Sequence, residues 1–197
     1  KKKKFSSKTI CVGNIYLGGT GKTQLVIELN NILKKNYKVS VIKKLYENQL
    51  DEQKLLKNKT NLILVKNRAN EINDIKNIKS VLIFDDGLQD KSISYDLSIV
   101  CFSSINGIGN GKLLPAGPLR EQLSQLNKYD TVFINGNKNK KLEREIRLNN
   151  KDIKIFYGKY FLKNKKQFSS KSNYLAVCGI GTPENFFDLL RQNKINI

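Results

Sequence analysis

One short stretch constrains the fold of this chain more than any other feature, and its residues are Gly18, Gly19, Thr20, Gly21, Lys22 and Thr23. An apolar run at residues 9–13 precedes it, and an amphipathic run at residues 22–35 follows it. Glycines let backbone N–H groups approach an anion closely, and the start of a helix supplies a positive end. A lysine and a hydroxyl complete a phosphate site, so the stretch predicts a strand, a phosphate-binding loop and a helix.

The strict spacing of such loops is G-x-x-x-x-G-K-[ST], and this chain has Tyr16 where the first glycine would stand. A glycine-rich turn that contains GKT by accident is therefore an alternative interpretation. The strand before the turn and the helix after it favour the phosphate-binding loop.

Alternating apolar runs predict the rest of the fold. Further strand-like runs lie at residues 38–43, 61–66, 80–84, 96–102, 130–135 and 174–178. Helices are expected at residues 48–58, at residues 118–126 and from Pro183 onward, after a turn at 179–181 with Thr182 as the cap. Continuous apolar strands among helices are typical of a parallel sheet covered on both faces. We expect an α/β fold of the P-loop NTPase type, with a mostly parallel sheet and helices on both faces.

Two neighbouring carboxylates, Asp85 and Asp86, follow the apolar run at residues 80–84. In P-loop enzymes an aspartate at the end of a core strand commonly holds Mg²⁺. A strand-ending turn with solvated carboxylates is the alternative. The nearby phosphate-binding loop favours a magnesium role.

Arg120 follows a glycine- and proline-rich stretch at residues 103–118, which predicts a long loop. In the first turn of the predicted helix, its positive charge opposes the helix dipole. A phosphate or a carboxylate partner would explain the position, and an ordinary surface arginine is the alternative.

The formal net charge is +19, from 36 Lys and Arg against 17 Asp and Glu. Only five of these cations are Arg, and nucleic-acid recognition relies on Arg forks and exposed aromatic rings, so no nucleic-acid partner is expected. Codon bias toward Lys, Asn and Ile on solvated faces is one interpretation of the charge. An anionic membrane surface or substrate is the other. The chain has no His, which excludes a His-based catalytic triad within it.

Five motifs occur along the chain in this order: VGNI at residues 12–15, GGTGKT at 18–23, DDGLQ at 85–89, GNGKLLPAGPLRE at 109–121 and GIGTPENFF at 179–187. Together they resemble the tetraacyldisaccharide 4′-kinase family of the lipid A pathway in Gram-negative bacteria. The resemblance runs from about residue 9 to about residue 191, and the third and fourth motifs, DDGLQ and GNGKLLPAGPLRE, together carry most of its specificity. The family also lacks the first glycine of the strict loop, which accounts for Tyr16.

The resemblance implies transfer of the γ-phosphate of ATP to the 4′-hydroxyl of a tetraacylated glucosamine disaccharide 1-phosphate, which gives lipid IVA. It assigns Lys22 to the β- and γ-phosphates, and Thr23 and Asp85 to Mg²⁺. Asp86 would organise the phosphoryl site. The sequence Leu-Asp-Glu-Gln at residues 50–53 partially matches the family's GDEP motif, so Asp51 is the candidate base.

Four further residues are implied as substrate-binding: Arg68, Gln89, Asn110 and Arg120. The two arginines would neutralise phosphate charge, Arg120 as the arginine of the family's PLRE sequence. The chain departs from the family at Asp90, where DDGFQH ends in His. It also departs at residues 43–47, Lys-Lys-Leu-Tyr-Glu, which replace the family's Ser-Arg-Gly-Tyr stretch before the base.

The chain contains no Met, and its last residues carry no helix stop. We therefore expect it to be the N-terminal nucleotide-binding part of a longer protein, without the family's N-terminal anchor helix and C-terminal portion. Residues 1–197 are expected to form one P-loop kinase domain, with a basic flanking segment at 1–8. Lys-rich exposed connections are expected at 138–141 and 163–173. The resemblance implies a location at the cytoplasmic face of the bacterial inner membrane, with its anionic surface as a partner.

Two other classes of function stay open. A P-loop ATPase or GTPase that acts as a switch or maturation factor would hydrolyse nucleotide without a lipid acceptor. A non-enzymatic basic module would bind nucleic acid or membrane. Phosphorylation of a lipid separates the kinase from the first class, and the effect of Lys22→Ala on binding separates it from the second.

Overall fold

The computed structural model describes residues 2–47, 49–72, 79–179 and 183–197. The chain forms two compact units, Lys1–Tyr157 and Gly158–Ile197. The phosphate-binding loop belongs to the first unit. The single domain expected over residues 1–197 stays a prediction.

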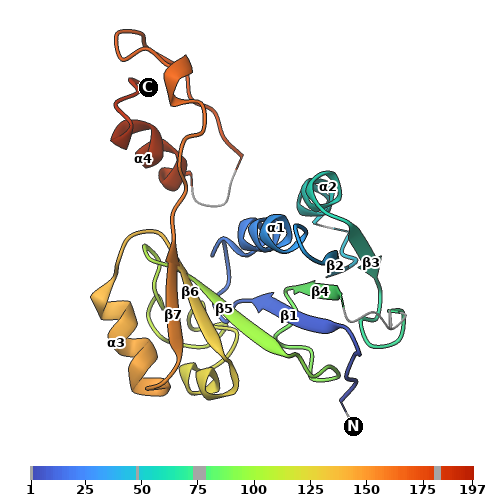
Figure 1. The fold of residues 1–197 in the computed structure, drawn as a ribbon. Coiled ribbons are helices and arrows are strands. Elements are labelled where there is room, and N and C mark those ends of the chain that lie inside the picture. The colour runs from blue at the N-terminus through green and yellow to red at the C-terminus, as the bar shows by residue number, and fades with distance from the viewer. Residues whose placement is uncertain (1, 48, 73–78, 180–182) are drawn as a thin grey trace. The chain divides into compact units, whose positions relative to one another are not determined.

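A seven-stranded sheet runs through the chain in the order β3-β2-β4-β1-β5-β6-β7 (Figure 1). Its strands are β1 (Lys8–Gly13), β2 (Lys38–Lys44), β3 (Leu62–Val65), β4 (Ser80–Asp85), β5 (Leu97–Ser103), β6 (Thr131–Asn135) and β7 (Lys154–Gly158). Every neighbouring pair from β3 to β6 is parallel. The predicted parallel sheet is thereby confirmed, with strand bounds close to those of the apolar runs.

Helices cover both faces of the sheet, as predicted (Figure 1). The helices α1 (Lys22–Leu33) and α2 (Leu50–Lys59) contribute Val26 and Leu56 to one buried cluster, and α3 (Lys140–Asn149) contributes Leu142 and Ile146 to the other. Because helices cover both faces of the sheet, β4 is buried along its whole length.

The order of the strands creates a site at the carboxyl end of β1. In the strand order, β2, β3 and β4 lie on one side of β1, and the later strands β5, β6 and β7 lie on its other side. In open parallel sheets, ligands bind in the crevice at such a switch point, outside the carboxyl ends of the strands. The phosphate-binding loop and the Asp85–Asp86 pair both lie at this end.

The helix predicted at residues 118–126 is wrong. The structure instead has a short 3₁₀ helix, η1 (Leu123–Lys128). Before it, the N–H of Arg120 donates to the carbonyl of Ile15 at 2.8 Å, and Leu119 bridges to Tyr16. These bonds to another segment hold residues 119 and 120 outside any helix, so the helix dipole has no bearing on Arg120.

Sequence analysis missed α3 and β7 and treated residues 138–141 as an exposed connection. In the structure, α3 begins at Lys140, and the side chain of Asn139 caps it by accepting the N–H of Leu142 at 2.9 Å. Lys140 and Lys141 are the exposed start of an amphipathic helix, whose buried face is made by Leu142 and Ile146.

In the second unit, the strand predicted at residues 174–178 is wrong. Leu175 and Val177 are 94% and 79% exposed, and the bridge nearest to this run joins Asn173 to Asn196. A strand needs a neighbouring strand to satisfy its backbone groups. The N–H of Tyr174 donates to the carbonyl of Asn196 at 2.9 Å, but no described strand pairs with residues 174–178.

The predicted last helix is present as α4 (Glu184–Gln192), directly after Pro183. Thr182 and the turn residues 180–181 lie outside the described residues. The short helix η2 (Lys165–Gln167) lies within residues 163–173, all of which are exposed. Among the described helices, none is long and apolar enough to cross a membrane.

Candidate functional site

The phosphate-binding loop joins the carboxyl end of β1 to the start of α1. Gly18 (φ 121°) and Gly21 (φ 84°) have positive φ angles, which glycine adopts at little cost. At Gly21, a Cβ would also lie 2.5 Å from Nδ2 of Asn135. Nδ2 of the buried Asn14 donates to Oγ1 of Thr20 at 3.2 Å and to the carbonyl of Gly18 at 3.3 Å. Glycine conformations and one buried amide therefore fix the shape of the loop.

The amino end of α1 has the features of an anion site. Its first turn carries Lys22 and Thr23 and no acidic residue, and Gly21 before it provides no side-chain cap. Uncapped N–H groups and the helix dipole both favour a negatively charged group here. This arrangement fits the phosphates of a nucleotide.

Asp85 ends β4 and is completely buried, with its Oδ2 paired to Nζ of Lys43 at 2.8 Å. Lys43 lies opposite Asp85 on the neighbouring β2, and its Nζ also reaches Oε2 of Glu52 at 3.0 Å. Burial lowers the pKa of Lys43, but the two carboxylates raise it by more, so this pKa lies above its ordinary value.

The other oxygen of Asp85, Oδ1, is buried and has no hydrogen-bond partner among the described residues. Mg²⁺ prefers oxygen ligands and is commonly held by one or two protein oxygens together with substrate phosphates and water. Oδ1 of Asp85 and the hydroxyl of Thr23 are oxygens of this kind. Within the described ranges, no cluster of three or more His, Cys, Asp or Glu could hold a metal by itself. The residues fit a magnesium ion that arrives with a nucleotide.

Asp86 has different partners from its neighbour. Its φ of 56° is in the left-handed region, which is uncommon for a residue other than glycine. Both carboxylate oxygens accept from Nη1 of Arg120 at 3.1 Å, and Oδ1 lies 3.8 Å from Nζ of Lys22. Burial raises the pKa of Asp86, but Lys22 and Arg120 lower it by more, so the pKa lies below its usual range. One carboxylate thus joins the lysine of the loop to Arg120.

Arg68 and Gln89 bind backbone atoms at the same place. Nη2 of Arg68 donates to the carbonyls of Asp85 at 2.9 Å and Asp86 at 3.1 Å. Nε2 of Gln89 donates to the carbonyl of Asn14 at 3.1 Å. Arg68 therefore fixes the turn after β4, and Gln89 links that turn to the phosphate-binding loop.

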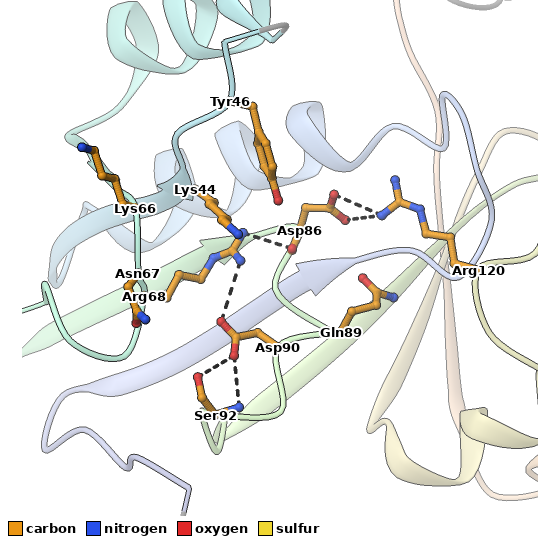
Figure 2. Close-up of a pocket in the computed structure, with 10 residues that line it drawn as sticks. All are labelled: Lys44, Tyr46, Lys66, Asn67, Arg68, Asp86, Gln89, Asp90, Ser92 and Arg120. Atoms are coloured by element: carbon orange, nitrogen blue, oxygen red, sulfur yellow. Dashed lines mark hydrogen bonds and ion pairs between the residues drawn. The ribbon is translucent and has the colours of Figure 1, made fainter.

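A cavity of about 530 Å³ opens beside these groups (Figure 2). Figure 2 shows Arg120 on one side of Asp86 and Tyr46 and Lys44 on the other. Four cations, two carboxylates and four other polar or aromatic side chains line the cavity: Lys44, Tyr46, Lys66, Asn67, Arg68, Asp86, Gln89, Asp90, Ser92 and Arg120. A polar cavity with an excess of positive charge suits a polar, anionic ligand.

The structure brings most of the predicted site residues together, but it leaves Asp51 and Asn110 outside the cavity lining. Asp51 is exposed in the first turn of α2. Asn110 closes its own loop, since its Nδ2 donates to the carbonyl of Ala116 at 2.9 Å and its Oδ1 accepts the N–H of Lys112 at 3.1 Å.

Sequence analysis assigned no role to Lys43, Glu52 or Asp90. Oδ2 of Asp90 lies 3.9 Å from Nη1 of the buried Arg68. One feature of the sequence could have pointed to Lys43: it is a charged residue at the end of an apolar strand. A charge at such a position needs a partner when it is buried.

A parallel sheet, a phosphate-binding loop after its central strand and a carboxylate pair at the end of the next strand define a P-loop nucleotide-binding protein. A model of the tetraacyldisaccharide-1-P 4′-kinase family matches residues 1–197. The chain belongs to this family, and the resemblance found in the sequence is confirmed.

Curated relatives carry the name tetraacyldisaccharide 4′-kinase. The protein of Pelagibacter ubique (strain HTCC1062) is 48% identical over 203 residues, covering 100% of this chain and 65% of the relative. The protein of Rickettsia bellii (strain OSU 85-389) is 33% identical over 217 residues, covering 97% of this chain and 64% of the relative. The chain thus spans somewhat less than two thirds of the length of these two relatives.

Two solved structures share the fold. LpxK from Aquifex aeolicus, crystallised in complex with ATP, has a TM-score of 0.71 at 22% identity, and the match covers 100% of this chain and 71% of that one. The hydrogenase maturation factor HypB from Archaeoglobus fulgidus has a TM-score of 0.55 at 15% identity, with 96% and 91% covered. These likenesses confirm the predicted α/β fold of the P-loop type.

Proposed function

We propose that the protein transfers the γ-phosphate of ATP to the 4′-hydroxyl of tetraacyldisaccharide 1-phosphate, which gives lipid IVA. Its family and the names of its relatives support this reaction. The observation that carries the proposal is the carboxylate of Asp86, which joins Lys22 of the phosphate-binding loop to Arg120 of the cavity wall. A nucleotide phosphate and an acceptor in the cavity would meet beside this group.

The nucleotide side of the site uses the loop and the start of α1. Backbone N–H groups at residues 18–21 would hold the phosphates, and Lys22 would reach the β- and γ-phosphates. Thr23 and Oδ1 of Asp85 would hold Mg²⁺. When bound, Mg²⁺ supplies positive charge that bridges and neutralises the phosphate oxygens.

Phosphoryl transfer depends mainly on position and on charge neutralisation. Lys22 and Arg120 supply positive charge from two sides, and Asp86 holds both cations in place through its carboxylate. The reacting phosphate would therefore enter a site whose cations are already oriented, and little reorganisation would be needed during the transfer.

The acceptor side is the polar cavity. Arg120, Gln89 and Arg68 line it and would bind the sugar and its phosphate. Asn110 would act through the loop that it closes, ahead of Arg120. This is the binding role expected from the sequence.

Asp51 is proposed as the base that accepts or orients the proton of the acceptor hydroxyl. A general base must first lie within hydrogen-bond reach of the proton that it accepts, so the placement of Asp51 is what the proposal depends on. Asp51→Ala is expected to lower transfer by about 10²- to 10⁴-fold, and near-normal turnover in this variant would contradict the assignment.

The proposed location is the cytoplasmic face of the bacterial inner membrane. The net charge of +19 favours contact with an anionic leaflet. Binding to vesicles with anionic lipids is expected to weaken steeply as salt increases, and salt-insensitive binding would contradict an electrostatic contact.

The test is product analysis. The protein expressed from its complete reading frame is incubated with ATP, Mg²⁺ and tetraacyldisaccharide 1-phosphate, and the lipid is examined by mass spectrometry and fragmentation. The expected product carries one additional phosphate on the 4′ position. Release of inorganic phosphate without any phosphorylated lipid would instead identify a nucleotide hydrolase.

A further inference from the structure

Lys43 forms an ion bridge between two carboxylates, buried at its Asp85 end and half-exposed at its Glu52 end, and the proposed reaction gives Lys43 no role. Its Nζ lies 2.8 Å from Oδ2 of Asp85 and 3.0 Å from Oε2 of Glu52. The side chains of Lys43, Asp85 and Glu52 are 2%, 0% and 51% exposed. A buried ammonium is costly unless it is paired and hydrogen-bonded, so the two carboxylates account for its position.

The bridge connects three elements that the sheet places side by side. Lys43 and Asp85 are register partners on the neighbouring strands β2 and β4 (Figure 1). Glu52 belongs to α2, which begins at Leu50 soon after β2 ends. Lys43 therefore connects the carboxyl ends of the strands, where the phosphate-binding loop lies, to the first turn of α2.

The first turn of α2 depends on such a connection. The residue before the helix, Gln49, provides no side-chain cap, and Leu50 is 66% exposed. Among the residues that the structure describes, two side-chain contacts tie this turn to β2 and the segment that follows it: Glu52 to Lys43, and Gln53 to the carbonyl of Tyr46. Of these two, only the contact of Glu52 continues to Asp85.

We propose that Lys43 is a positioning residue, which holds the first turn of α2, and Asp51 on it, at a fixed place relative to Asp85 and the phosphate-binding loop. The proposal rests on the proposed function, because that function gives Asp51 its role as base. Asp51 directly precedes Glu52, so a shift of this turn moves Asp51 as well. A misplacement of about 1 Å can cost about a hundredfold in rate.

Glu52→Ala is the decisive variant. It removes the α2 end of the bridge and leaves the buried Lys43–Asp85 pair, so the variant is expected to fold. Lys43→Met removes both ends, and Glu28→Ala is the matched control, because Glu28 is an exposed glutamate on α1. The variants are made in the protein expressed from its complete reading frame. Each is measured for kcat and KM of lipid phosphorylation, for ATP affinity, and for hydrogen exchange at residues 50–53.

Glu52→Ala is expected to lower kcat about 10- to 100-fold and to speed exchange at residues 50–53. Its ATP affinity is expected to stay within about twofold, because Asp85 keeps its partner. Glu28→Ala is expected to match the wild type. In a Lys43→Met/Glu52→Ala double variant, kcat is expected to equal that of Lys43→Met, since both changes break one bridge.

Three results would overturn the proposal. One is a wild-type kcat in Glu52→Ala. Another is a loss of ATP affinity as large as the loss of kcat, which would mean that the bridge acts on the nucleotide. The third is full additivity in the double variant. An inactive wild-type protein would contradict the proposed function, whereas an active wild type with an equally active Glu52→Ala variant would contradict the positioning role alone.

Discussion

The two sides of the carboxyl end of β4 differ, although they are built on adjacent residues. On one side, Asp85 faces β2 and α2, is fully buried and pairs with Lys43. On the other side, Asp86 faces the phosphate-binding loop and the cavity and pairs with Lys22 and Arg120. The strand β4 ends at Asp85, and the left-handed φ of 56° at Asp86 belongs to the turn that follows, so the two neighbouring carboxylates have different partners.

This difference teaches that one Asp-Asp motif can serve two purposes. The Asp85 side joins strands and a helix into a framework and leaves one oxygen for a metal ion. The Asp86 side holds cations beside a cavity, where the charge of a reacting phosphate would develop. Loss of the Asp85 carboxylate should therefore cost more stability than loss of the Asp86 carboxylate, and loss of a cation beside Asp86 should lower transfer with little cost in stability.

The largest effect is expected from Lys22→Ala on the Asp86 side. Loss of the loop lysine removes charge from the transferred phosphate and is expected to lower lipid phosphorylation by about a thousandfold. Because Nζ of Lys22 lies as far as 3.8 Å from the carboxylate of Asp86, the midpoint of thermal unfolding should change little. The measurement is kcat/KM together with a melting curve, and a loss of less than about tenfold would break the account of this side.

The comparison itself is tested by Asp85→Asn against Asp86→Asn. Asp85→Asn leaves the ammonium of Lys43 without its buried partner and is expected to cost about 3–5 kcal/mol of unfolding free energy. Asp86→Asn disrupts partly exposed pairs and is expected to cost about 1 kcal/mol or less. Denaturant unfolding without nucleotide measures both. Equal losses in the two variants would show that the sides do not differ as described.

Arg120→Gln sharpens the comparison on the cavity side. Gln keeps polarity and removes the charge, so transfer is expected to fall by about a hundredfold while the unfolding free energy stays nearly constant. Steady-state kinetics at saturating ATP measure the loss. Unchanged kinetics would mean that Arg120 only orders the loop before η1.

The smallest effect is a pH dependence of stability. The folded state holds the pKa of Asp86 below its usual range, so this carboxylate stabilises the fold above the unfolded pKa of about 3.9. That stabilisation is lost as the pH falls through the lower folded-state pKa. Asp86→Asn should therefore lose less unfolding free energy than the wild type between neutral pH and about pH 3. Parallel curves for the two proteins would contradict the assigned pairing of Asp86.

Much of the fold could be predicted because its signals are local. Continuous apolar runs marked six of the seven strands, and the glycine-rich loop marked the start of α1 at Lys22. The strand at residues 174–178 failed because an apolar run says nothing about whether a partner strand exists. The helix at 118–126 failed because the bond between Arg120 and Ile15 joins distant segments.

The candidate site was predictable only where a motif names the residue. Asp85, Asp86 and Lys22 follow from their spacing, but the division of partners between the two aspartates depends on strand register. The pairing of Lys43 with Asp85 joins positions 42 residues apart, and no local pattern reports it. Arg68 was expected to bind substrate, and the structure adds its bonds to the backbone after β4.

The measurement that tests the central claim most directly is the dependence of ADP formation on the lipid acceptor. The protein expressed from its complete reading frame is supplied with ATP and Mg²⁺, with and without tetraacyldisaccharide 1-phosphate, and ADP and phosphorylated lipid are counted together. The account predicts that ADP forms only with the acceptor present, with one phosphorylated lipid for each ADP. Equal ADP release with and without the acceptor would contradict it and would identify a nucleotide hydrolase on the same P-loop fold.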